Sequence, residues 1–138
     1  MPHITVEYSA NLDSRLDLAR LLRAAHAAAL STGVFKLGAV RTRAERRDLY
    51  MVADGAAENA FVSVQVRIGI GRDSKTRRAL GAAIFEAVSR ELNPVFESTP
   101  IGLTLEVIEI DETAAFRRNT LHERMEGRRF EPASEPAA

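Results

Sequence analysis

The chain has 138 residues with equal numbers of basic and acidic side chains, 19 of each, so its formal net charge is zero. This balance argues against binding to nucleic acid or to a membrane surface, because both partners select for a basic excess. The absence of cysteine excludes disulfides and thiolate chemistry, and no apolar run fits a membrane span or a signal peptide, so we expect a cytoplasmic protein.

The first half of the chain predicts a strand, a helix and a further pair of strands. Residues 1–8 alternate between apolar and polar side chains, which is typical of a half-buried strand. Apolar residues recur at helical spacing over 18–29, and Gly33 stands where a C-terminal helix cap is expected. Residues 38–53 predict a hairpin or strand pair, with its bend at the charged residues 45–48.

The second half begins with another strand and helix. Residues 61–68 alternate in the same way as the first strand. Asp73 or Ser74 is expected to cap the helix that follows. We expect this helix to end before Pro94 and the asparagine that precedes it, because a residue before proline avoids helical torsions.

A last strand and a charged C-terminal region complete the chain. In the strand predicted over 103–110 the apolar pattern slips between Val107 and Ile108, which indicates a β-bulge or a change of burial. After a segment at 113–126, the sequence becomes rich in proline, alanine and glutamate. We therefore predict a disordered tail at 127–138.

The two halves, 2–58 and 59–112, repeat each other. A shift of 58 residues superposes one apolar face on the other, namely Ile4, Val6 and Tyr8 on Val62, Val64 and Val66. Two such βαβ units predict one α+β domain over 1–126, with a four-stranded sheet and both helices on one face. The other face is polar, and we expect it to form a subunit interface. Its residues are Thr5, Glu7, Ser63, Gln65 and Arg67.

Pro2 is the first candidate for chemistry. Removal of Met1, which a small second residue permits, would leave a chain that begins with a free secondary amine. An α-amino group titrates near ~7.7–8.0, and an apolar pocket or a nearby cation lowers that pKa. Such a base suits proton transfer at a carbon beside a carbonyl. The alternative is a proline that only starts the strand. The shift of 58 residues makes Ala60 the counterpart of Pro2 in the second half. Ala60 lies in mid-chain and has no free amine, so we expect one site per subunit.

Several short motifs occur in a fixed order along the chain. They are Met-Pro-His-Ile-Thr-Val-Glu at 1–7, Thr-Gly-Val-Phe at 32–35, Val-Arg-Thr-Arg at 40–43, Ala-Asp-Gly at 53–55, Ala-Phe-Val at 60–62, Ile-Gly-Ile-Gly-Arg at 68–72 and Phe-Arg-Arg-Asn-Thr-Leu-His at 116–122. The ordered set resembles the 5-carboxymethyl-2-hydroxymuconate isomerases of the tautomerase superfamily. No single motif decides this resemblance, which covers residues 2 to about 122.

The resemblance implies the tautomerase fold, a homotrimer and an isomerase that needs no cofactor and no metal. It implies 5-carboxymethyl-2-hydroxymuconate, an intermediate of homoprotocatechuate (4-hydroxyphenylacetate) breakdown, as the substrate, with the Pro2 amine as general base. Two alternatives stay open. The same fold could act on another unsaturated 2-oxo or 2-hydroxy diacid, or the chain could be a non-catalytic trimeric protein that binds small acids.

Three arginines are candidates for the substrate's carboxylates. Arg41 and Arg43 lie two residues apart on a predicted strand and so share one face. Arg41 matches the first arginine of the family motif, and Arg43 is its competitor. Arg72 follows two glycines and precedes a helix, so its guanidinium and the helix N-terminus would form an anion site. We expect Arg41 and Arg72 to bind carboxylates and to stabilise charge on the carbonyl oxygen.

Other readings of the polar residues are weaker. Gly69 and Gly71 lack the third glycine of a dinucleotide-binding turn, because Ser74 stands there. The three histidines, His3, His26 and His122, have no metal-ligand spacing. We expect His26 to be structural and His3 to point away from the face that Pro2 uses, and His122 receives no role.

Overall fold

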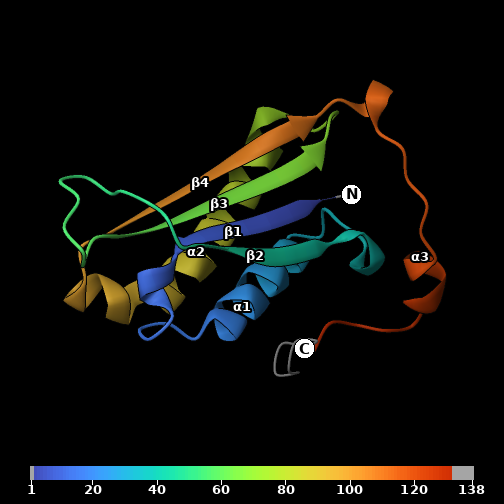
Figure 1. Cartoon of the computed structure of the whole chain (residues 1–138). Coiled ribbons are helices and arrows are strands. Elements are labelled where there is room, and N and C mark those ends of the chain that lie inside the picture. Colours follow the sequence, from blue (N-terminus) through green and yellow to red (C-terminus); the bar gives the residue numbers. More distant parts are fainter. Residues whose placement is uncertain (1, 132–138) are drawn as a thin grey trace.

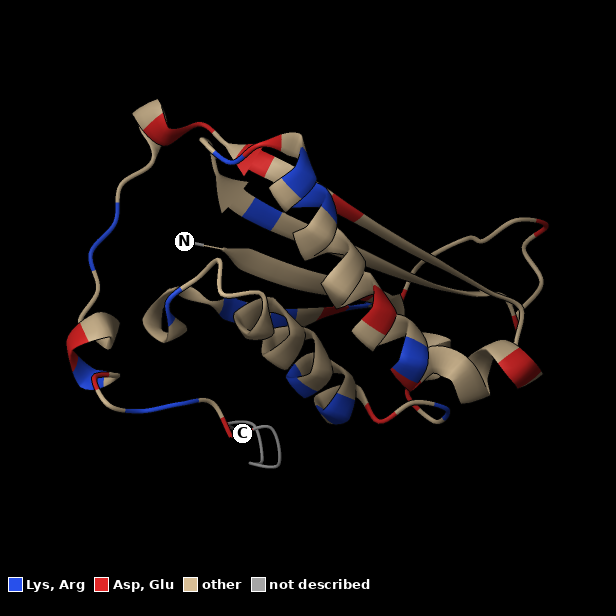
Figure 2. Ribbon diagram, turned by 180° about the vertical axis from the view of Figure 1, so that it is seen from behind, with Lys and Arg blue, Asp and Glu red and all other residues tan. Residues whose placement is uncertain are grey.

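Four strands form one mixed sheet, and two long helices cover one of its faces (Figures 1 and 2). The computed structural model describes residues 2–131. The main elements are β1 (His3–Ser9), α1 (Leu18–Ser31), β2 (Arg41–Arg47), β3 (Ala60–Gly69), α2 (Ser74–Ser98) and β4 (Ile101–Ile110). Shorter turns are the 3-10 helices η1 (Ala10–Leu12), η2 (Leu37–Ala39) and η3 (Glu112–Ala114), and the single-turn helix α3 (Leu121–Arg124).

The sheet order is β2-β1-β3-β4. Within each half the two strands are parallel, and the halves meet through the antiparallel pair β1 and β3. Val6 lies opposite Val64 at the middle of that pair, so the halves are related by an approximate two-fold axis. This arrangement confirms the prediction of two βαβ units with both helices on one face.

The core lies between the sheet and the helices. The inward residues of β1 and β3 are fully or almost fully buried, and they are Ile4, Val6, Tyr8, Val62, Val64, Val66 and Ile68. The helices cover them with Leu21, Ala25 and Ala29 from α1 and Leu80, Ile84, Val88 and Leu92 from α2. The buried positions of the two helices therefore correspond at a spacing of 59 residues, one more than the strands.

The predicted hairpin at 38–53 is wrong, because β2 is a single strand that pairs with β1. The charged end of β2 stays extended because the side chains of Arg46 and Arg47 each pair with a carboxylate. Arg46 Nε lies 2.6 Å from Asp13 Oδ2, and Arg47 Nε lies 2.6 Å from Glu7 Oε2. The chain then crosses to β3 through a loop of residues 48–59.

The predicted end of the second helix is also wrong. Helix α2 continues through Pro94 to Ser98. Pro94 is exposed and lies in the last turns, and Leu92 and Val95 beside it are buried. Packing of these two side chains holds the helix beyond the point where backbone preference alone would end it.

Strand β4 contains no bulge. Its pairing with β3 is unbroken from Ala60 opposite Ile101 to Gly69 opposite Ile110. Val107 and Ile108 are both partly buried although they lie on opposite faces. The slip in the apolar pattern therefore reflects a change of burial, because Ile108 lies on the open face of the sheet and is still partly buried.

The C-terminal segment leaves β4, runs past the end of the sheet through α3 and returns beside α1 (Figure 1). The Phe130 ring lies 4.7 Å from the His26 ring, centroid to centroid. The rest of the predicted tail, residues 132–138, lies outside the described residues. None of the described helices is long and apolar enough to cross a membrane.

Candidate active site

The sequence candidates gather at one end of the sheet. Strands β1 and β2 begin there and β3 and β4 end there, as their parallel and antiparallel pairing requires (Figure 1). The register places His3 between Arg41 and Arg67. Pro2 precedes His3, and the loop that carries Arg72 follows Gly69, so both lie at this same end.

Pro2 is buried at the tip of a central strand. Its carbonyl oxygen accepts a hydrogen bond from the Arg41 backbone N–H at 3.2 Å. His3, the next residue, is paired on both sides, with β2 and with β3. The fold therefore holds Pro2 in place, although residues near a chain end usually fray.

The Arg41 guanidinium folds back over the turn before its strand. Its Nη1 atom donates to the Ala39 carbonyl oxygen at 2.7 Å and lies 3.4 Å from that of Gly38. Both contacts use one nitrogen of the five-donor guanidinium. Within residues 2–131 no other acceptor bonds this side chain, so the Nε and Nη2 edge is available for a carboxylate.

Arg43 has a different neighbour. Its Nη1 lies 3.1 Å from His3 Nδ1 on the open sheet face. A guanidinium can only donate, so Nδ1 accepts and carries no proton. Partial burial, and then the cations Arg43, Arg41 and Arg67, lower the pKa of His3 below its ordinary value. The unprotonated Nδ1 agrees with this lowered pKa, and the ring lies on the sheet face opposite the helices.

Arg72 reaches toward the first half of the chain. Its guanidinium carbon lies 5.1 Å from the centre of the Phe35 ring, and its Nη1 lies 3.4 Å from the Gly69 carbonyl oxygen. A cation above an aromatic face is attracted by the ring's electron density. Gly71, at φ +109°, gives the loop a backbone conformation that other residues rarely adopt.

The N-terminus of α2 beside Arg72 is already capped. Asp73 Oδ1 accepts from the Thr76 backbone N–H at 2.8 Å, which identifies Asp73 as the cap. That backbone hydrogen bond is the main cause of the lowered pKa of Asp73. An anion at this end would meet the Asp73 carboxylate, so anion binding here depends on the Arg72 side chain more than on the helix terminus.

The C-terminal segment packs closely on both loops at this end. A methyl group on Gly38 would lie 3.0 Å from the His122 backbone nitrogen, and one on Gly69 would collide with the Glu112 carboxylate. Glu112 in turn pairs with Arg117 at 3.1 Å. These two glycines allow the chain after β4 to lie against η2 and against the loop of Arg72.

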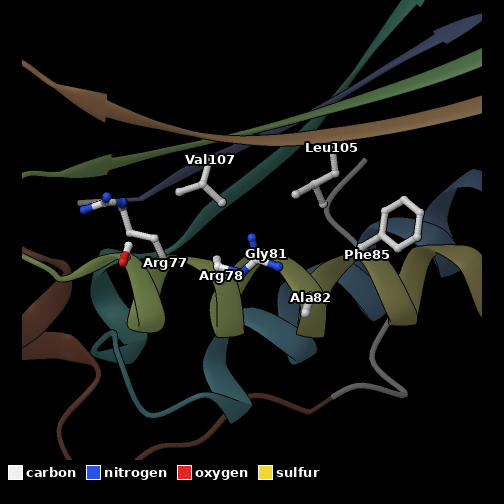
Figure 3. Close-up of a pocket in the computed structure, with 8 residues that line it drawn as sticks. Arg77, Arg78, Gly81, Ala82, Phe85, Leu105 and Val107 are labelled. Carbon is white, nitrogen blue, oxygen red and sulfur yellow. The ribbon is translucent and has the colours of Figure 1, made fainter.

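Two surface hollows differ in their relation to this end. One of about 550 Å³ lies between α2 and β4, with Phe85, Leu105 and Val107 along it and Arg77 at one end (Figure 3). It includes none of the predicted site residues. The other, of about 490 Å³, lies between η2 and α3 and is lined by Gly38 and His122. We place the candidate site at the Pro2 end of the sheet and not in the first hollow, because the first hollow offers apolar surface but no candidate base.

The arrangement brings Pro2 and the segments that carry Arg41 and Arg72 to one end of the sheet. Such a site can bind an anion and can move a proton if the terminal amine is free. Phe35 lies in the motif at 32–35, but its contact with Arg72 was not predicted from the sequence. No group of three or more metal-binding side chains comes together within the described residues.

Comparison with known proteins identifies the family. The family model described as 5-carboxymethyl-2-hydroxymuconate isomerase matches residues 2–125. This chain belongs to the 5-carboxymethyl-2-hydroxymuconate isomerase family. The resemblance predicted from the ordered motifs is confirmed, and the chain is an isomerase by this relationship.

Similar proteins agree with this assignment. The 5-carboxymethyl-2-hydroxymuconate Delta-isomerase of Escherichia coli is 32% identical over 122 residues, which cover 88% of this chain and 97% of that protein. A solved 5-carboxymethyl-2-hydroxymuconate isomerase from Deinococcus radiodurans R1 has a TM-score of 0.84 at 30% identity, covering 89% of this chain and 92% of that one. A fused 4-OT protein, solved as a symmetric trimer, has a TM-score of 0.61 at 22% identity over 91% of this chain and 99% of that one, and it supports the fold alone.

Proposed function

We propose that this isomerase converts 5-carboxymethyl-2-hydroxymuconate to its 2-oxo-3-ene isomer in homoprotocatechuate degradation. The observation that carries the proposal is Pro2 held at the tip of a central strand and bonded to the Arg41 backbone. The relative from Escherichia coli bears the name of this activity. The reaction proposed here uses no cofactor and takes place in the cytoplasm.

The proposed reaction moves one proton. With Met1 removed, the neutral Pro2 amine takes the proton from the 2-hydroxyl of the dienol. The electron pair of that O–H bond forms the C2 carbonyl, the C2–C3 double bond moves to C3–C4, and the C4–C5 electrons take the proton back at C-5. The amine is neutral again at the end. Burial at the strand tip favours its neutral form.

Two arginines divide the remaining work in this proposal. Arg72, on the face of Phe35, anchors a substrate carboxylate. Arg41, next to Pro2, stabilises the negative charge that develops on the C2 oxygen. Arg43 is engaged with His3 and serves the substrate only as a second, weaker contact. A homotrimer, the state of the fused 4-OT protein, completes the proposal.

Two measurements test the function. The intact mass of the active protein should correspond to a chain that starts at Pro2. Turnover of a panel of enol and keto diacids should be fastest with 5-carboxymethyl-2-hydroxymuconate. Full activity of protein that retains Met1 would remove the amine from the mechanism, and faster turnover of another diacid would replace the substrate but keep the site.

A further inference from the structure

The two arginines assigned to the substrate share one local arrangement. Arg41 Nη1 lies 3.4 Å from the carbonyl oxygen of Gly38, three residues earlier in the chain. Arg72 Nη1 also lies 3.4 Å from the carbonyl oxygen of a glycine three residues earlier, Gly69. Each guanidinium therefore folds back over its own loop, where a backbone carbonyl is one of the acceptors that orient it. The direction of each side chain depends on where its glycine lies.

Both glycines are buried under the chain that follows β4. We call residues 112–122 of this chain the strap. A Cβ on Gly38 would lie 3.0 Å from the backbone nitrogen and from Nδ1 of His122. A Cβ on Gly69 would collide with Oε1 of Glu112. Neither glycine has a positive φ, so the strap, and not the backbone conformation, leaves no room for a side chain at these positions.

The strap is itself fixed at both ends. Gly69 pairs with the last residue of β4, so the sheet register brings Glu112 to the loop of Arg72. Glu112 Oε2 pairs with Arg117 Nη2 at 3.1 Å, which holds the carboxylate in place. At the other end, Asn119 Oδ1 accepts from the Leu121 N–H at 3.0 Å, where α3 begins. Between these ends the strap passes the end of the sheet (Figure 1).

We propose that Glu112 and His122 are positioning residues of the isomerase. Glu112 holds the loop of Arg72, and His122 holds the loop of Arg41, so one segment aims both guanidinium groups. Groups that bind a substrate must be held within about 0.5 Å of their productive place, and packing from outside gives a loop that precision. The inference rests on the proposed function only in assigning the two arginines to the substrate.

Alanine at each glycine tests the two contacts separately. A misplacement of about 1 Å costs on the order of a hundredfold in rate, so a shift of part of an ångström should cost about three- to tenfold. Gly69→Ala displaces the loop of the carboxylate anchor, Arg72, and should raise KM by this factor with kcat nearly constant. Gly38→Ala displaces the loop of Arg41 and should lower kcat by this factor with KM nearly constant.

Gly81→Ala is the matched control for these two variants. Gly81 is also buried and crowded, because a Cβ there would lie 3.1 Å from Val107 Cγ2, but it lies within α2 and does not contact the strap. This variant should leave kcat and KM unchanged. If Gly38→Ala and Gly69→Ala change kcat and KM in the same way, or no more than the control does, the strap does not position the arginines.

Removing the strap side chains tests the same contacts without adding volume. Glu112→Ala should raise KM as Gly69→Ala does, and the double variant should be no worse than the worse single variant, because both changes release one contact. Effects that multiply in the double variant would overturn the role of Glu112. His122→Ala should lower kcat as Gly38→Ala does, and it tests the loop of Arg41 even where Gly38→Ala fails to fold.

An NMR measurement separates this inference from the proposed function. The side-chain Nε–H signals of the two arginines report their surroundings without turnover. Gly38→Ala should shift the Arg41 signal and leave that of Arg72 in place, and Gly69→Ala should do the reverse. This pattern in a protein that does not turn over 5-carboxymethyl-2-hydroxymuconate would overturn the proposed function and keep the positioning role. If neither signal moves, the positioning role is wrong, whatever the activity.

Discussion

The two halves of the molecule share one βαβ topology but differ in the residues that they contribute to the candidate site. The first begins at Pro2, and the second begins at the corresponding Ala60, whose amide donates to the Pro100 carbonyl oxygen at 2.9 Å in mid-chain. The position that corresponds to Arg41 is Thr99, which accepts a hydrogen bond from Arg15 at 3.2 Å. Only the first βαβ unit therefore carries a candidate site, because only that unit has Pro2 at the tip of its first strand and an arginine at the start of its second strand.

The halves also differ in what they bury. Helix α1 has 14 residues and buries two alanines beside Leu21, whereas α2 has 25 residues and buries Leu80, Ile84 and Val88 in the corresponding turns. Helix α2 therefore supplies more of the large core side chains than α1 does. The first half supplies Pro2, Arg41 and the ring under Arg72.

The largest expected effect comes from placing Pro2 in mid-chain, as Ala60 is in the second half. An uncleaved extension before Pro2 makes its nitrogen an amide, which has no basic lone pair. The loss of a general base should lower kcat about 10²- to 10⁴-fold, with little change in the melting temperature. Steady-state kinetics on protein of verified mass checks this. Pro2→Ala, which leaves a primary amine, is the control and should keep part of the activity, whereas an active extended chain would contradict the amine mechanism.

Paired core variants sharpen the contrast in burial. Ile84→Ala leaves a cavity under α2 and should lower the free energy of unfolding by about 2–5 kcal/mol. Ala25→Gly, at the corresponding buried position of α1, removes a single methyl and should cost about 1 kcal/mol. Chemical denaturation measures both. Equal losses would mean that the halves share the core evenly.

Arginine variants test how Arg41, Arg43 and Arg72 share substrate binding and catalysis. A hydrogen bond between charged partners contributes roughly 1.5–3 kcal/mol, so Arg41→Ala or Arg72→Ala should cost about ten- to a hundredfold in kcat/KM. We expect Arg72→Ala to act mainly on KM and Arg41→Ala mainly on kcat. Arg43→Ala should be mild. If Arg43→Ala is the most costly of the three, the choice within the pair Arg41 and Arg43 is wrong.

The contact between Arg43 and His3 can be tested separately, through the pKa of His3. Its cation is, after burial, the next cause of the lowered pKa of His3. Arg43→Ala should therefore move that pKa upward toward its ordinary value near ~6.5, which a proton NMR titration of the ring would show. Arg43→Lys keeps the charge and should leave the pKa low. An unchanged value in Arg43→Ala would remove this coupling.

The sequence predicts the two βαβ units well, because the alternation over 1–8 and 61–68 leaves only one choice of buried face for each strand. It fails where tertiary contacts override local preference. Arg46 remains in a strand because Asp13 lies beside it, and α2 passes Pro94 because Leu92 and Val95 are buried. The Asp13 contact joins residues 33 positions apart, which periodicity cannot reveal.

The candidate site is predictable only in part for the same reason. Pro2, Arg41 and Arg72 stand out by position and motif, and the sheet register brings their segments to one end. The contact of Arg72 with Phe35 joins residues on two different loops, so neither loop alone predicts it. The choice of His3 as the neighbour of Arg43 depends on β2 pairing in parallel with β1.

The smallest expected effect compares the helix caps of the two halves. Both helices begin with an aspartate, Asp17 bonded to the Arg20 N–H at 3.1 Å and Asp73 bonded to the Thr76 N–H at 2.8 Å. The Thr76 backbone and then its side chain hold the pKa of Asp73 below its ordinary value. The folded state therefore binds fewer protons than the unfolded state near that pKa. The stabilisation is complete above the unfolded value of about 3.9 and is lost as pH falls through the folded value.

Asp73→Asn separates the charge of this cap from its hydrogen bond. An asparagine oxygen still accepts from the Thr76 N–H but does not titrate, so the wild type should melt at a higher temperature than the variant near pH 7. That difference should shrink as the pH falls below about 4, because the wild-type carboxylate becomes protonated. Asp17→Asn is the matched variant in the first half. A difference for Asp73→Asn that stays constant from about pH 7 to pH 3 would show that the Asp73 charge does not stabilise α2.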